Sequence, residues 1–164
     1  NYKMRIFLIL NIIFLTNLSF ATNQSDYLSD KKIFFPTDSL RGTFLICVSK
    51  KEPANPRMVM GFKFQDTRVF GYRIGIKQNK AQVQNWTPAD YPYVSAITTD
   101  TVAWWNSLYA LNRETLILND GINSKQCEVQ SNDLAYATKI EEHRKELQIL
   151  LNKEISERTK NNKI

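Results

Sequence analysis

The chain has 164 residues, 43% of them hydrophobic, and a formal net charge of +6 at pH 7. This length suits one domain with a sizeable core. The basic residues are scattered singly or in pairs, whereas nucleic-acid binding requires a cluster on one face. We therefore expect a mixed, solubilising surface and no nucleic-acid partner.

Residues 1–21 have the pattern of a secretory signal peptide, with Lys3 and Arg5 at the positive end and an apolar run from Ile6 to Leu15. A membrane anchor is the alternative, but the run is shorter than the about 20 apolar residues that span a bilayer. We expect cleavage, which leaves residues 22–164 exported to the periplasm or secreted, without a stable membrane span. The net charge then falls from +6 to +4, because the leader carries two basic residues and no acid.

We expect the mature chain to begin with a polar, flexible segment, residues 22–41, in which Ile33–Phe35 can dock as a short edge segment, since Pro36 cannot join a central ladder. From residue 42 to residue 130, short runs of alternating apolar and polar residues are separated by turns, which predicts an antiparallel meander. Gly42–Ser49 is apolar on both faces, so we expect a covered strand. Further strands are predicted over Arg57–Phe64, Val69–Lys77, Ala81–Trp86 (anchored by Val83), Tyr93–Thr99 and Thr101–Asn106.

The clearest strand–turn–strand signal lies between residues 108 and 129. Residues 115–118 and 123–130 are β-prone, and Asp120-Gly121 between them is a strong turn pair. Leu111 and Leu116 are an odd number of residues apart, so in one continuous strand their side chains would point to opposite faces. A bulge or a second turn is therefore expected between them.

The two cysteines, Cys47 and Cys127, are expected to form one disulfide in an exported chain. Closing a loop of about 80 residues contributes on the order of 4 kcal/mol. There is no Cys-x-x-Cys and one histidine, so we expect neither a metal site nor a cofactor. The fold class is mainly β: seven or eight antiparallel strands in a curved sheet or incomplete barrel, with the disulfide joining the first confident strand to the last.

A family resemblance rests on the run Trp105…Asn112-Arg113-Glu114-Thr115-Leu116…Cys127. It resembles small exported β-sheet proteins of unknown function, in which an Asn-Arg-x-Thr strand follows a Trp-bearing strand and leads to a last cysteine. This chain has Leu116 where a Gly often follows the Thr. The resemblance implies a fold and an export route, and no activity. The layout is also similar to that of C-type lysozyme inhibitors of the bacterial periplasm, without their Ser-Gly…Tyr and Trp-x-Lys-Gly elements.

From residue 131 to residue 160 the apolar period becomes helical, and Ser131 or Asn132 is placed to cap the helix. Residues 161–164 are expected to fray. A helix of roughly 27 residues is about 40 Å long, longer than the domain is wide, so it should overhang, bend or find a partner. Its expected apolar stripe is Leu134, Ala137, Ile140, Leu147, Leu150, Leu151 and Ile155.

The aromatic candidates for a binding site are Trp104 and Trp105, which on a strand point to opposite faces. One can be core, while the other is either covered or exposed to a sugar or protein ligand. An exposed patch would extend to Trp86, Tyr91, Tyr93 and Tyr109. Arg113 and Glu114 are either a recognition pair, a solvated strand end or a bulge-fixing contact.

Catalytic signals are weak. His143 is expected to be a packing residue, and the aspartates at predicted turns (Asp66, Asp90, Asp100 and Asp120) suggest no acid–base pair. Leu147 and Leu151 either pack on the sheet or form a partner interface. We therefore predict a non-enzymatic exported module that binds a protein partner, or self-associates through the helix. A secreted inhibitor of a cell-wall-degrading enzyme is the alternative, and a small hydrolase is a third possibility.

Overall fold

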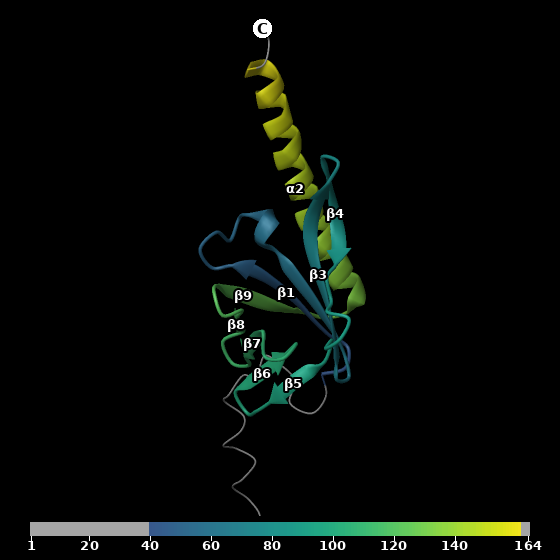
Figure 1. Ribbon diagram of the computed structural model, residues 1–164, viewed down its shortest axis with the longest axis vertical. Helices are drawn as coiled ribbons and strands as arrows, with labels where there is room; N and C mark the ends of the chain where they lie inside the picture. The colour runs from purple at the N-terminus through teal and green to yellow at the C-terminus, as the bar shows by residue number, and fades with distance from the viewer. Residues whose placement is uncertain (1–39, 162–164) are drawn as a thin grey trace, which may run out of the picture. The chain divides into compact units, whose positions relative to one another are not determined.

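The computed structural model describes residues 40–161, which all belong to one compact unit of the chain. They form a nine-stranded antiparallel sheet and one long helix (Figure 1). The predicted segment Ile33–Phe35 lies outside these residues, as does the predicted signal peptide. The elements are β1 Thr43–Ser49, η1 Pro56–Met58 (a 3₁₀ turn), β2 Met60–Gln65, β3 Arg68–Lys77, β4 Lys80–Asn85, β5 Val94–Ile97, β6 Thr101–Trp104, β7 Tyr109–Asn112, β8 Ile117–Asn119, β9 Ser124–Gln130 and α2 Asp133–Asn161.

The strand order is β4-β3-β2-β1-β9-β8-β7-β6-β5, so two meanders meet where β1 pairs with β9. The predicted fold class, an antiparallel meander with a C-terminal helix, is confirmed. The sheet curls without closing: Tyr93, just before β5, forms an isolated bridge with Arg68 at the start of β3. Main-chain bonds of 2.7 Å from Val69 N to Pro92 O and from Val94 N to Thr67 O support that bridge.

The predicted disulfide between Cys47 and Cys127 is present, with an S–S distance of 2.03 Å. The two cysteines are register partners on β1 and β9, with their Cα atoms 4.0 Å apart. The first and last strands are therefore neighbours in the middle of the sheet, and the disulfide fastens the two meanders at their junction.

A turn separates β7 from β8 and explains the change of parity between Leu111 and Leu116. Asn112 Oδ1 accepts hydrogen bonds from the main-chain nitrogens of Glu114 and Thr115, at 3.0 and 2.8 Å. An asparagine side chain that bonds to the backbone ahead of it stabilises a turn. With β7 and β8 separate, the sheet has nine strands where seven or eight were expected.

The strand predicted from residue 57 begins only at Met60, because the preceding residues form η1. The choice of Val83 as the anchor of β4 is wrong. Val83 is 40% exposed, whereas Ala81 is 3% exposed and packs beneath α2.

The sheet has a hydrophobic core on each face. Leu45 and Cys47 point from β1 into the inner core, while Ile46 points to the helix-side core, which confirms that β1 is covered on both faces. The inner core comprises Leu40, Leu45, Cys47, Phe62, Phe64, Val69, Val102, Trp104, Trp105, Tyr109, Leu111, Leu118 and Cys127. The helix-side core comprises Ile46, Val59, Ile74, Ala81, Tyr136, Ile140, Leu147 and Leu151.

Helix α2 begins after Asn132, whose Oδ1 accepts a hydrogen bond from Ala135 N at 2.8 Å, as a capping residue does. The expected apolar stripe is partly wrong. Leu134 is 77% exposed, Leu150 and Ile155 are more than a third exposed, and Tyr136, which the stripe omitted, is buried. The buried face is therefore rotated towards Tyr136.

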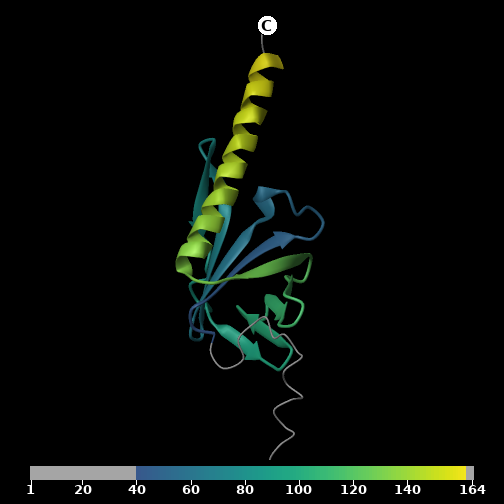
Figure 2. The same cartoon turned by 180° about the vertical axis from the view of Figure 1, so that it is seen from behind.

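The 29 residues of α2 extend about 44 Å at 1.5 Å per residue. Seen from both sides, the helix crosses the sheet and its last turns run past the β3–β4 hairpin (Figures 1 and 2). The expected overhang is therefore present. Among the described residues, no helix is both long and apolar enough to cross a membrane.

Candidate functional site

Trp104 and Trp105 are both buried in the inner core, with exposed fractions of 0% and 1%. The prediction that they point to opposite faces is wrong. Trp105 has φ of 55° and starts the turn after β6, so the two residues do not alternate as they would within a strand. The indole nitrogen of Trp105 donates a hydrogen bond to Val69 O at 3.1 Å. Neither tryptophan presents a surface to a ligand.

The aromatic patch expected around these tryptophans is divided between core and surface. The ring centroid of Tyr109, in the inner core, lies 5.3 Å from that of Phe62, and that of Trp86, which is partly buried and packs against this core, lies 6.5 Å away. Tyr91 and Tyr93, in contrast, are 44% and 52% exposed. Only these two tyrosines are available for binding.

Arg113 and Glu114 do not form a recognition pair, because Arg113 is buried and Glu114 is exposed. Arg113 Nη1 donates to Thr98 O at 2.8 Å, and its main-chain nitrogen donates to Asp100 O at 2.8 Å. Arg113 therefore ties the β7–β8 turn to the β5–β6 turn.

The helical candidates Leu147 and Leu151 are 0% and 6% exposed in the helix-side core. They pack on the chain's own sheet. His143 lies 3.0 Å from Glu146 on the same helix, and its side chain is largely covered.

Lys63 lies under the start of α2 among three aromatic rings. Its ammonium is 5.8, 5.6 and 4.8 Å from the ring centroids of Phe44, Tyr72 and Tyr136, and it pairs with Asp133. Such a cage attracts cations. Here the chain's own lysine fills it, so it fixes the helix to the sheet.

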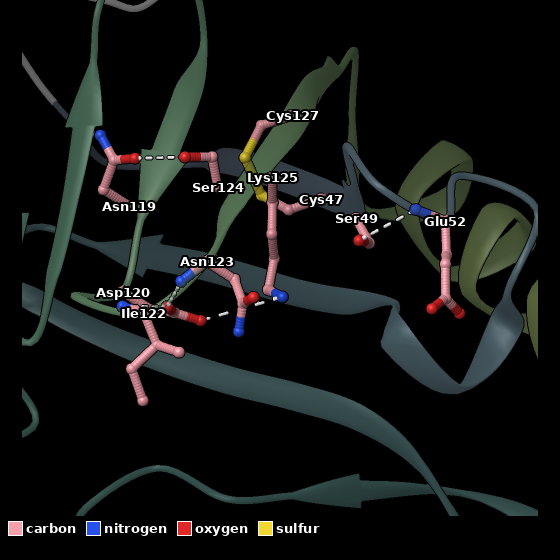
Figure 3. Close-up of polar contacts among 10 residues, drawn as sticks. All are labelled: Cys47, Ser49, Glu52, Asn119, Asp120, Ile122, Asn123, Ser124, Lys125 and Cys127. Atoms are coloured by element: carbon pink, nitrogen blue, oxygen red, sulfur yellow. Dashed lines mark hydrogen bonds and ion pairs between the residues drawn. A yellow bond between two sulfur atoms is a disulfide. The ribbon is translucent and has the colours of Figure 1, made fainter.

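Figure 3 shows a buried lysine, Lys125, beside the disulfide. The Lys125 side chain is 5% exposed, and its Nζ lies 3.9 Å from Asp120 Oδ2. Asp120 Oδ1 accepts from the main-chain nitrogens of Ile122 and Asn123, at 3.1 and 2.7 Å. Asp120 thus balances the buried charge of Lys125 and closes the β8–β9 turn. Lys125 was not among the residues singled out from the sequence. Among residues 40–161, no group of three His, Cys, Asp or Glu could hold a metal ion.

Exposed apolar side chains gather around β5, and sequence reasoning named only part of this group. Ile97 is 54% exposed, and every residue from Ser95 to Ile97 is exposed. Ser107 N donates to Ser95 Oγ at 3.1 Å, which holds the turn with the 49%-exposed Leu108 against β5. With Tyr91 and Tyr93, these residues form what we call the β5 surface.

The two edges of the sheet differ in their protection. On β4, Ala81 N donates to Gln148 Oε1 at 2.9 Å, and Arg144 Nη1 donates to Ala81 O at 3.3 Å. Helix α2 thus satisfies the outward main-chain groups of Ala81, near the start of β4. On β5, the bridge at Tyr93 lies before the strand, and within residues 40–161 no strand pairs with the other side of residues 95–97. An open edge is a template for another strand.

Comparisons of the chain with protein-family models, with curated proteins and with solved structures find no match.

Proposed function

We propose that this chain is an exported, non-enzymatic module that binds another protein, and that the partner docks on the β5 surface. The observation that supports this most is the exposure of Tyr93, just before β5, and of Ile97, on a strand that pairs along one side only among residues 40–161. Apolar groups gathered on a surface favour association, and tyrosines contribute strongly to binding energy.

Two further observations support the choice of surface and compartment. The disulfide is consistent with an oxidising, extracytoplasmic environment. The apolar face of α2 is already used by the sheet, and beyond Leu151 the helix is mostly polar, with Glu154 bound to Arg57 at 2.9 Å. Docking through the buried helix stripe, including self-association, is therefore less favoured than docking at β5.

The test places a photo-crosslinking amino acid at Tyr93 in the full chain, expressed in its source cells. We expect one specific protein adduct. The matched control carries the same group at Ile149, which is 69% exposed on α2, and should give none. Loss of any Tyr93 adduct, or equal adducts at both positions, would contradict the proposal.

The alternative, inhibition of a cell-wall-degrading enzyme, is a special case in which the partner is a lysozyme. It is tested by measuring lysozyme activity with a stoichiometric excess of the purified mature chain. Inhibition that Tyr93→Ala relieves would identify that partner class, and unaffected activity would eliminate it.

A further inference from the structure

We infer that the end of the molecule where α2 runs past the β3–β4 hairpin binds the surface of an anionic lipid bilayer. This end, which we call the overhang, consists of Arg57, residues 77–80 at the hairpin tip, and α2 from residue 149 to residue 161. The inference adds a second surface to the β5 surface, and neither surface depends on the other.

Side-chain contacts fasten the overhang to the sheet. Gln148 Nε2 donates to Asn79 O at 3.2 Å, and Arg57 Nη2 donates to both carboxylate oxygens of Glu154 at 2.9 Å. After Gln148, α2 continues for 13 residues, or about 20 Å, and its last turns project beyond the hairpin tip (Figures 1 and 2). The overhang is therefore held in place and can be approached from several sides.

The overhang carries the whole net charge of the described residues. With histidine counted as neutral, residues 40–161 have 17 basic and 13 acidic side chains, a net charge of +4. Six of the basic and two of the acidic side chains belong to the overhang, so the remaining 11 of each sign cancel. Five exposed basic side chains of the overhang make no ion pair within residues 40–161: Lys77, Lys80, Lys153, Arg158 and Lys160.

The direction of these charges favours a flat surface over a folded partner. At about 100° per residue, Lys153 and Lys160 lie on the side of α2 opposite the buried Leu151, and Ile149, which is 69% exposed, lies beside Lys153. A protein interface surrounds a buried apolar core with matched polar groups. An anionic bilayer instead attracts each basic side chain near it without a matched group, and it admits scattered aliphatic side chains among its headgroups.

The experiment measures co-sedimentation of the mature, disulfide-bonded chain with lipid vesicles. One set of vesicles is phosphatidylcholine, which has no net charge, and the other set also contains phosphatidylglycerol, which is anionic. We expect about tenfold tighter binding to the anionic set. This preference should disappear at about 1 M salt, where the Debye length falls to about 3 Å.

Matched variants locate the surface. Lys153→Glu/Lys160→Glu should weaken binding to anionic vesicles about tenfold, because two attractive charges become repulsive. Lys139→Glu/Lys145→Glu changes the net charge equally on the same helix, but before Gln148, and should weaken binding less than about twofold, because salt screens distant charges. Thermal unfolding followed by circular dichroism checks that both variants keep the fold.

Equal binding to both sets of vesicles, or equal loss in the two double variants, would overturn the inference. Soluble polyglutamate that binds as tightly as the anionic vesicles would overturn the choice of a bilayer in favour of an acidic polypeptide. Full competition by inorganic phosphate would overturn it in favour of a discrete phosphate site. Lys153→Glu/Lys160→Glu should leave the Tyr93 adduct unchanged, so failure of the inference and failure of the proposed function are seen separately.

Discussion

Replacing Leu147 with Ala tests whether α2 belongs to the fold. Leu147 is fully buried in the helix-side core, between Ile140 and Leu151 on the same face of the helix. The substitution removes the methine carbon and both methyl carbons of the side chain from a site where the sheet limits collapse. Leu→Ala changes in such cores cost about 3 kcal/mol.

The assay is urea and thermal unfolding of the mature, disulfide-bonded chain, followed by circular dichroism. For a domain of this size, 3 kcal/mol lowers the Tm by about 10 °C. The urea midpoint should fall with an unchanged m-value, because the denatured state exposes nearly the same surface.

The matched control is the identical substitution at Leu134, on the same helix but 77% exposed. It should change stability by no more than about 0.5 kcal/mol, since surface changes rarely do more. Equal effects at Leu147 and Leu134, or no loss at Leu147, would refute the packing of α2 on the sheet.

Three other outcomes are expected. Gly61→Ala should destabilise by about 1–3 kcal/mol, because its Cβ would overlap Tyr136 Oη, and Tyr136→Phe should partly rescue it in a double-mutant unfolding cycle. Burial raises the pKa of both Tyr109 and Tyr136 above the ordinary 10.0, so the unfolded chain loses these protons first. Their contribution to stability is therefore complete below about pH 10 and lost as the pH rises further, and replacing both with Phe should flatten the alkaline decline in unfolding free energy. The double substitution Cys47→Ser/Cys127→Ser should lower the free energy of unfolding by on the order of 4 kcal/mol. Mass spectrometry of the unsubstituted, non-reduced protein should find no free thiol.

Much of the fold followed from local patterns. A continuous apolar run located β1, and the Asp120-Gly121 pair located the β8–β9 turn, because both signals reside in neighbouring residues. The change of apolar face between Leu111 and Leu116 required a break in the strand, but it did not show whether the break was a bulge or a turn. The turn at Asn112 forms because its side chain bonds to the two nitrogens that follow.

The candidate site was predicted less well. Strand alternation placed Trp104 and Trp105 on opposite faces, and a left-handed φ at Trp105 puts both into the inner core. For Arg113 the sequence left a recognition pair, a solvated strand end and a bulge-fixing contact open, and the carbonyls of residues 98 and 100 decide for a buried contact between turns. Tyr93 was named only as a possible extension of a tryptophan patch, and Ile97 was not named at all.

The sequence by itself determined that the chain is a β-meander followed by a long helix and fastened by one disulfide. Backbone periodicity and a single cysteine pair carry that information locally. Only the tertiary structure decided which face of α2 is buried, in which register β1 and β9 pair, and that α2 covers Ala81 on β4 while Ile97 on β5 is exposed. These features depend on strand register and on contacts between residues as many as 97 positions apart, which no local pattern encodes.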